Sequence, residues 1–397
     1  MESRIVAHDT PLTPHETVLV MQGGGSLGAY ECGVYKTLKR HELEFDIVAG
    51  TSIGAINAAI IAGNNSESSA KILEQFWLSL AERITPSFLE DNIRAIFSSF
   101  IGSLYGNKNL FEPVWFYPAS LLNYYSIFSS YTRIPPHLYD VKPLEETLTK
   151  FVDFQRINKM YKNGIPSMSV PKKESKGASP RLIMTCTDIQ RSESVTFNSD
   201  NMEIDAGHVI ACTGFPFYGL PWTKKNGLFL WDGSLLSNTP LREVIDASPK
   251  NHKRVYIVNL FPKIQKELPT NMFDIWHRAR DIIHTDKTDH NIHMSKIISK
   301  YLTLMRQMHD LLNNAHIDDA MKDIFIKIEE DYHKLATDRG AIIEEITKIE
   351  RAEDIRYIFE DADFSLVTIK KLIKQGEDDA EKVLNEKNKD INQVSNS

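Results

Sequence analysis

Three short segments of the chain contain residues whose types and spacing suit nucleophilic catalysis. The first is Gly50-Thr51-Ser52-Ile53-Gly54, a G-x-S-x-G pattern between an apolar run and an alanine-rich run. A serine at a sharp strand-to-helix turn exposes its hydroxyl, and the free N–H groups that begin the helix lie where an oxyanion would form. Glycines on both sides let the backbone bend without a clash from Cβ. The pattern predicts a serine nucleophile.

The second segment is a glycine-rich loop, Gly23–Gly28, with the sequence GGGSLG. It lies between an apolar run at Thr17–Met21 that predicts a strand and a run at Ala29–Arg40 that predicts a helix. Such a loop can hold a phosphate or an oxyanion on its backbone N–H groups. With Glu44 or Asp46 about 20 residues on, it also fits a dinucleotide-binding fingerprint. A nicotinamide or flavin enzyme is therefore a rival interpretation, although such a site needs no serine turn directly afterwards.

The third segment contains an Asp-Gly pair, Asp232-Gly233. Such a pair is most often a plain turn. Here it follows the apolar run Phe229–Trp231, which predicts a strand. Asp232 would then lie at the end of that strand, where sites in open α/β sheets gather.

Several apolar runs predict the elements that would position these segments. Phe45–Ala49 indicates a buried strand before the serine, and Ala55–Ala62 indicates a tightly packed helix after it. Arg181–Asp188 and Ser194–Phe197 indicate a hairpin, and Arg254–Leu260 indicates a further buried strand.

In this order the three segments resemble the patatin-like phospholipase family. The resemblance covers roughly residues 15–262, and it includes Leu182–Asp188, Val209–Pro216 and Ser237–Pro240. It implies an α/β fold, with a three-layer α/β/α hydrolase core and a helical C-terminal extension. The remainder of the chain resembles the extra C-terminal region of a bacterial subgroup. We expect a catalytic domain over residues 1–262 and a mainly helical region over residues 263–397.

The resemblance also implies a serine–aspartate dyad that works without a catalytic histidine, a cofactor or a metal. Ser52 would be the nucleophile, and Asp232 would accept its proton and return it to the leaving group. A carboxylate is a weak base in water, but partial desolvation raises its pKa. The implied oxyanion donors are the backbone N–H groups of Gly23, Gly24, Gly25 and Ile53. The remaining motif positions are Gly28, Gly50, Gly54 and Gly233.

Two residues depart from the family pattern. Leu27 stands where many members have a basic residue, which weakens the expectation of a contact with a phosphate head group. Ser234 replaces the small apolar residue or glycine that usually follows Asp-Gly.

We therefore expect hydrolysis of carboxylic esters in lipids, with phospholipids or lysophospholipids as the family substrates. Alternatives are an esterase acting on non-phosphorylated lipids or polyesters, and a lipid-binding protein without turnover. The formal net charge of −7 argues against general nucleic-acid binding. Three widely spaced cysteines fit a reducing compartment. We see no signal peptide and no apolar run long enough to span a membrane, so we expect a cytoplasmic protein whose membrane contact is peripheral.

Residues 97–139 are rich in aromatic side chains and poor in charge. They could be an insertion that fills part of the core, or a cap or lipid-touching surface over the serine, because Tyr and Trp suit a boundary between water and an apolar phase.

The region after Pro262 contains long charged helical patterns. Asn291–Ala315 has a helical apolar stripe, which indicates packing against the catalytic domain or a homo-oligomer contact. Ile342–Ile349 is compatible with either a helix or a strand. The pair His290 and His293 could share a helical face, but no carboxylate or cysteine completes a recognisable metal set, so we expect no metal site.

Overall fold

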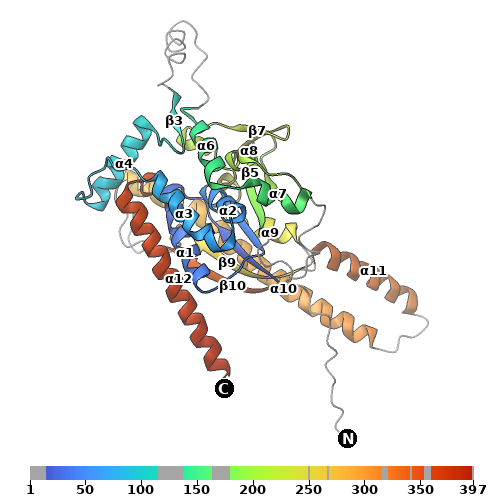
Figure 1. Cartoon of the computed structure of the whole chain (residues 1–397). Helices are drawn as coiled ribbons and strands as arrows, with labels where there is room; N and C mark the ends of the chain where they lie inside the picture. The colour runs from blue at the N-terminus through green and yellow to red at the C-terminus, as the bar shows by residue number, and fades with distance from the viewer. Residues whose placement is uncertain are drawn as a thin grey trace.

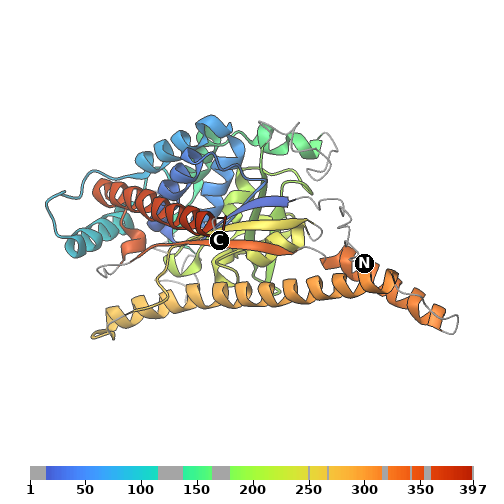
Figure 2. The ribbon, with the colours of Figure 1, turned by 90° about the horizontal axis from the view of Figure 1, so that it is seen from below.

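The computed structural model describes residues 15–114, 137–162, 179–248, 251–265, 268–314, 321–339, 342–352 and 359–395. Over these residues the chain forms a mixed β-sheet between two layers of helices, which confirms the predicted three-layer α/β/α class (Figures 1 and 2).

The main sheet has the strand order β10-β9-β1-β2-β5-β8-β7, with β6 also paired to β5. Neighbouring strands from β10 to β5 run parallel, whereas β6, β7 and β8 pair antiparallel. The strands are β1 (His15–Met21), β2 (Ile47–Thr51), β5 (Arg181–Asp188), β6 (Glu193–Asn198), β7 (Thr223–Lys225), β8 (Leu228–Asp232), β9 (His252–Asn259) and β10 (Ile343–Glu350). Two short strands, β3 (Glu112–Pro113) and β4 (Tyr139–Asp140), pair separately.

Helices cover both faces of the sheet. Over the described residues the helices are α1 (Gly28–Arg40), α2 (Ile53–Gly63), α3 (Ser66–Leu80), α4 (Asp91–Tyr105), α6 (Lys142–Phe151), α7 (Phe154–Lys162), α8 (Ala206–Ala211), α9 (Leu241–Ala247), α10 (Met272–Asn313), α11 (Lys322–Arg339) and α12 (Leu366–Ser395). The larger apolar core joins α1, α2, α3 and α12 to one face. A smaller core joins α9 and α10 to the other face.

The central strands and α2 are rich in apolar residues and are buried along their whole length. Every residue of β2 and of β5 is buried, as expected for strands covered on both faces. Every residue of α2 is buried as well, and its small side chains allow it to lie close to the sheet. The strands and helices predicted around the serine and the glycine loop are thus confirmed.

The region after residue 262 contributes directly to this core. The segment Ile342–Ile349, which is compatible with either a helix or a strand by sequence, falls almost entirely in β10 (Ile343–Glu350), which pairs with β9. Helix α12 crosses α1 so closely that a Cβ on Gly33 would lie 1.9 Å from the Ile373 carbonyl oxygen. Helix α10 runs along the face of the sheet opposite α12 (Figure 2). The division of the chain at residue 262 stays a prediction, but these elements and the N-terminal ones share one core.

Part of the predicted aromatic insertion, residues 115–136, lies outside the described residues. Its described flanks are α4, β3 and β4. Among the helices that the structure describes, none combines the length and the apolar character that crossing a membrane requires.

Candidate active site

Ser52 occupies a strained turn between β2 and α2. Its backbone has φ 55° and ψ −124°, a conformation that costs free energy for any residue with a Cβ. The turn is tight, since a Cβ on Gly50 would lie 2.1 Å from the Gly54 carbonyl oxygen. A Cβ on Gly54 would lie 2.6 Å from the carbonyl oxygen of Met21 in β1. Both flanking glycines are therefore needed for the chain to turn at this serine.

The glycine loop lies directly against this turn. A Cβ on Gly23 would lie 2.8 Å from the Cβ of Ser52. Gly25 has φ 56°, and a Cβ there would lie 2.2 Å from the carbonyl oxygen of Asp361. The absence of side chains lets the loop backbone approach Ser52 on one side and the C-terminal region on the other.

The segment after Asp232 holds the glycine loop in place. Asn238 accepts a hydrogen bond from the Gly23 N–H at 3.1 Å and donates one to the Gly23 carbonyl at 3.3 Å. The Gln22 side chain donates to the Thr239 hydroxyl at 2.8 Å. The sequence motifs do not indicate this role of Asn238. Within the described parts of the chain, the N–H groups of Gly24, Gly25 and Ile53 make no hydrogen bond, so they are available as donors.

Asp232 ends β8 and is fully buried. Its backbone is fixed by bonds from its own N–H to the Gly214 carbonyl, 3.1 Å, and from the Thr187 hydroxyl to its carbonyl, 3.0 Å. Its side-chain Oδ1 accepts two hydrogen bonds from Ser234, from the backbone N–H at 2.8 Å and from the hydroxyl at 2.5 Å. Its Oδ2 has no partner of ordinary hydrogen-bond geometry among the described residues.

Burial raises the pKa of Asp232 to about 6, while the hydroxyls of Ser234 and Ser52 act in the opposite direction. Ser52 is thus close enough to influence the carboxyl, and contacts of this kind are often long before a substrate binds. A carboxyl with this pKa is ionised above neutrality, and it is a stronger base than an exposed aspartate.

A buried polar network supports the site from behind. The Trp77 indole donates to the Asn57 side chain at 3.0 Å, and Asn57 donates to Glu31 at 2.8 Å and to the Gly28 carbonyl at 3.1 Å. Burial raises the pKa of Glu31 well above its ordinary value. The network joins α1, α2 and α3. Asn57, a polar residue inside an apolar helix, is the only sequence signal for it.

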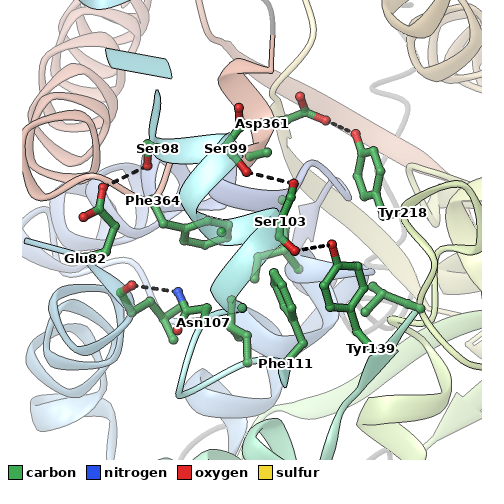
Figure 3. Close-up of a pocket in the computed structure, with 18 of the residues that line it drawn as sticks. Glu82, Ser98, Ser99, Ser103, Asn107, Phe111, Tyr139, Tyr218, Asp361 and Phe364 are labelled. Carbon is green, nitrogen blue, oxygen red and sulfur yellow. Dashed lines mark hydrogen bonds between the residues drawn. The ribbon is translucent and has the colours of Figure 1, made fainter. Parts of the chain in front are cut away.

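Ser52 lines a cavity of about 1210 Å³. One wall comes from α4 and the segments beside it, where Phe111, Tyr139 and Phe364 lie around the cavity (Figure 3). Gly23, Gly24, Gly25 and Ile53 line the same cavity, whereas Asp232 lies behind it. A large and mainly apolar cavity of this kind suits a ligand with hydrocarbon chains.

The C-terminal region supplies another wall of this cavity. The short turn Glu360–Ala362 packs on the glycine loop, where the Ser26 hydroxyl donates to the Glu360 carbonyl at 2.8 Å. The Asp361 carboxylate accepts a hydrogen bond from Tyr218 (Figure 3). It accepts another, at 2.6 Å, from Arg280 of α10. Nothing in the sequence motifs indicated that residues near 361 would reach the loop.

The positions of Leu27 and of the described histidines indicate roles other than binding Ser52. Leu27 is buried in the core and does not line the cavity. His208 caps α8 with Asp205. His284 lines the cavity and stacks on Phe261, with 4.8 Å between ring centroids. Among the residues that the structure describes, no histidine hydrogen-bonds the side chain of Ser52 or Asp232.

The chain matches one known sequence family, several individual proteins and several solved structures. The family model described as patatin-like phospholipase matches residues 19–245. The triacylglycerol lipase SDP1L of Arabidopsis thaliana is 36% identical over 73 residues, which are 18% of this chain and 9% of that protein. The human patatin-like phospholipase domain-containing protein 6 is 33% identical over 97 residues, 24% of this chain and 7% of that protein. The chain thus spans less than a tenth of the length of either relative.

Two solved structures are similar over most of the chain. VipD from Legionella pneumophila has a TM-score of 0.39 and 13% identity, and the match covers 96% of this chain and 72% of VipD. The type III effector protein ExoU has a TM-score of 0.34 and 14% identity, and the match covers 94% of this chain and 54% of ExoU.

Proposed function

The chain belongs to the patatin-like phospholipase family, and from this and the geometry of the site we propose that it is a serine acyl hydrolase acting on carboxylic esters of lipids. The observation that carries the proposal is the pairing of a strained, cavity-lining Ser52 with a buried Asp232 whose Oδ2 is unbonded among the described residues. A nucleophile and a base with a pKa near neutrality are the two groups that acyl transfer requires.

In the first half of the reaction, the Ser52 hydroxyl attacks the ester carbonyl as its proton passes to Asp232 Oδ2. The tetrahedral oxyanion is held by the backbone N–H groups of Gly24, Gly25 and Ile53. The N–H of Gly23 is engaged by Asn238, so in this proposal Gly23 brings the loop close to Ser52 instead of donating. Each oxyanion donor stabilises the transition state by roughly 3–4 kcal/mol. The protonated Asp232 then gives its proton to the leaving alcohol.

In the second half, water hydrolyses the acyl-enzyme on Ser52. Asp232 accepts a proton from the attacking water and returns it to the Ser52 oxygen when the tetrahedral intermediate collapses. This is the first step in reverse with water in the place of the alcohol. Both halves use the same carboxylate, so neither needs a histidine or a bound cofactor.

The cavity favours a lipid as the acyl donor. Its volume of about 1210 Å³ and apolar walls suit hydrocarbon chains. Phospholipids and lysophospholipids are the first substrates to test. Non-phosphorylated lipid esters and polyesters follow, because Leu27 provides no cation at the loop position where many family members have one. A lipid-binding protein without turnover is the outcome if Ser52 does not react.

Helix α4 supports a peripheral contact with a membrane surface. Phe100 and Tyr105 both line the cavity and reach solvent, and Ile93, Phe97 and Leu104 are exposed on the same helix. Its charged residues are Asp91 and Arg94, and Arg94 is buried and paired. An exposed uncharged face beside the cavity would enter a lipid interface at little electrostatic cost.

The buried free thiols of Cys32, Cys186 and Cys212 suit a reducing compartment such as the cytoplasm. Exposed apolar residues on α10, including Tyr301 and Leu304, support a homo-oligomer contact through the C-terminal helices.

The test measures hydrolysis of a p-nitrophenyl ester and of mixed phospholipid vesicles, together with covalent labelling by a fluorophosphonate. We expect Ser52→Ala to lose both activities and the label, and Asp232→Asn to lose at least about 100-fold in rate while staying folded. Ser192→Ala is the matched control, because Ser192 also has a positive φ, 57°, but is exposed and lies outside the cavity. Full activity in Asp232→Asn would exclude Asp232 as the base, and His284→Gln would then test the cavity histidine. Ester turnover with inert vesicles would select the non-phospholipid substrates.

A further inference from the structure

A cluster of three metal-ligating side chains forms between α10 and α11. Glu329 and His333 lie one helical turn apart on α11, and His309 faces them from α10. The Glu329 Oε1 atom is 3.4 Å from the His309 Nε2 atom and 3.5 Å from the His333 Nε2 atom. The ligand atoms of all three lie within 4.8 Å of one another. The two helices lie side by side where they extend beyond the sheet (Figures 1 and 2).

These separations match those around a tetrahedral metal ion. Bonds of about 2.0–2.1 Å to nitrogen and oxygen place neighbouring ligand atoms roughly 3.3–3.4 Å apart. Both distances that involve Glu329 are already close to this value. The His333 side chain is 68% exposed, so it can rotate to close the third edge.

Two neighbours of His309 support a ligand role beyond simple proximity. The Tyr332 ring stacks on the imidazole, with 3.9 Å between centroids and an angle of 15° between planes, which fixes the orientation of the ring. On its other side, the Nδ1 atom is 3.7 Å from the Asp310 carboxylate, which is beyond hydrogen-bond distance. The Asn313 amide nitrogen lies 3.3 Å from Nδ1 and 3.2 Å from Nε2, so a metal on Nε2 would displace it. A shortened Asp310 contact would then supply the carboxylate that usually lies behind a metal-bound imidazole, where it orients the ring and makes the other nitrogen a better ligand.

We propose that His309, Glu329 and His333 bind a divalent zinc ion that fastens α11 to α10, with water in the fourth position. Two imidazoles and one carboxylate suit zinc and its neighbours in the first transition row, whereas magnesium and calcium need more oxygen ligands. Such a metal ion would stabilise the α10–α11 hairpin, because the exposed side chains of Ile324, Ile326 and Ile328 on α11 contribute little packing energy. A metal contributes free energy that this packing does not supply.

This site is not recognisable from the sequence, because its ligands come from separate helices. His290 and His293 looked suggestive by spacing, yet they remain without a third ligand within the described residues. His309 and Glu329 are separated by 20 residues, and only the return of α11 beside α10 brings them together. The competing interpretation of the cluster is a plain ion pair between protonated histidine and Glu329.

Isothermal titration of the full-length, tag-free protein with Zn²⁺ tests the proposal. We expect one equivalent to bind, and His309→Ala, Glu329→Gln and His333→Ala each to weaken binding at least about 100-fold. His293→Ala on the same helix is the matched control and should bind as the wild type does. Co²⁺ should give the intense visible absorption of a tetrahedral site, and Zn²⁺ should slow hydrogen exchange in α11.

Three outcomes would overturn the proposal. The first is zinc binding that is equal in all variants, which would indicate adventitious surface sites. The second is the absence of stoichiometric binding to a folded wild type, which would leave an ion pair. The third is equal binding of Mg²⁺. None of these readouts uses the esterase reaction, so the result is independent of the proposed catalysis at Ser52.

Discussion

Replacing Ser234 by alanine would remove a single hydrogen bond from the proposed base. The Ser234 hydroxyl donates to Asp232 Oδ1 at 2.5 Å, while the backbone N–H of the same residue would continue to donate at 2.8 Å. The hydroxyl stabilises the ionised carboxylate more than the protonated form, so its loss raises the pKa of Asp232 further above the value of about 6 that burial produces.

The size of the effect follows from the strength of a hydrogen bond to a charged group. Such a bond contributes about 1.5–3 kcal/mol, and 1.36 kcal/mol corresponds to one pKa unit. The pKa of Asp232 should therefore rise by about 1–2 units. At pH 5, where both proteins are mostly protonated, kcat/KM should fall by about 10- to 100-fold in Ser234→Ala. Above pH 9 the two proteins should converge, because Asp232 is ionised in both.

The assay is the pH dependence of kcat/KM for a soluble p-nitrophenyl ester, read at the isosbestic wavelength of the product. This parameter reports the ionisation of the free enzyme. Ser234→Thr keeps the hydroxyl and should keep the wild-type profile. An unchanged acid limb in a folded Ser234→Ala protein would refute the reasoning, because either Asp232 is not the titrating base or the hydroxyl does not hold it.

Stability offers a second readout with a defined sign. The folded-state pKa of Asp232 lies above its unfolded value of about 4, so this group's contribution to stability is fully present below pH 4 and is lost as the pH rises through about 6. Ser234→Ala extends that loss to higher pH. Relative to wild type, its free energy of unfolding should be lower by about 1.5–3 kcal/mol at pH 9 and should recover towards acid pH.

Two further predictions concern the glycine loop and α4. Gly25→Ala should lower kcat and destabilise the fold, because its Cβ would lie 2.2 Å from the Asp361 carbonyl oxygen. Gly227→Ala is the control, since Gly227 also has a positive φ, 80°, but has no neighbouring atom within reach of a Cβ. If Gly227→Ala lost as much melting temperature and kcat as Gly25→Ala, backbone strain alone would explain both losses. The double variant Phe97→Ser and Leu104→Ser should reduce vesicle hydrolysis about tenfold and leave the soluble ester unaffected, since interfacial binding grows with buried apolar area. Leu304→Ser on α10 serves as its control. Equal rates of vesicle hydrolysis in the double variant and the wild type, at the same protein concentration, would argue against α4 as the lipid-facing surface.

The sequence was sufficient for the parts of the site that rest on local backbone geometry. Gly50 and Gly54 around Ser52 predict a tight turn because only glycine avoids the backbone contacts found there. Runs rich in apolar residues predict β2 and β5, and both strands are buried on both faces. These features depend on neighbours along the chain, so they can be recognised without a structure.

Other features depend on contacts between distant residues, and the sequence could not show them. Asn238 engages the N–H of Gly23, and the Ser234 hydroxyl turns towards Asp232 instead of solvent. The same holds for β10, whose residues match either a helix or a strand until β9 is placed beside them. Asn and Ser occur so often at turns and surfaces that their identity alone does not indicate such roles.

The contact between the glycine loop and the turn at Glu360–Ala362 has a consequence for the timing of activity during synthesis. Ser26 and Glu360 are 334 residues apart, so the proposed nucleophile, its base and the loop all leave the ribosome long before the turn that packs on the loop. A nascent chain that ends before this turn has the proposed nucleophile and base but lacks the contact that supports the glycine loop. The proposed hydrolysis would therefore begin only after the turn at Glu360–Ala362 has been made, so shorter nascent chains would be inactive.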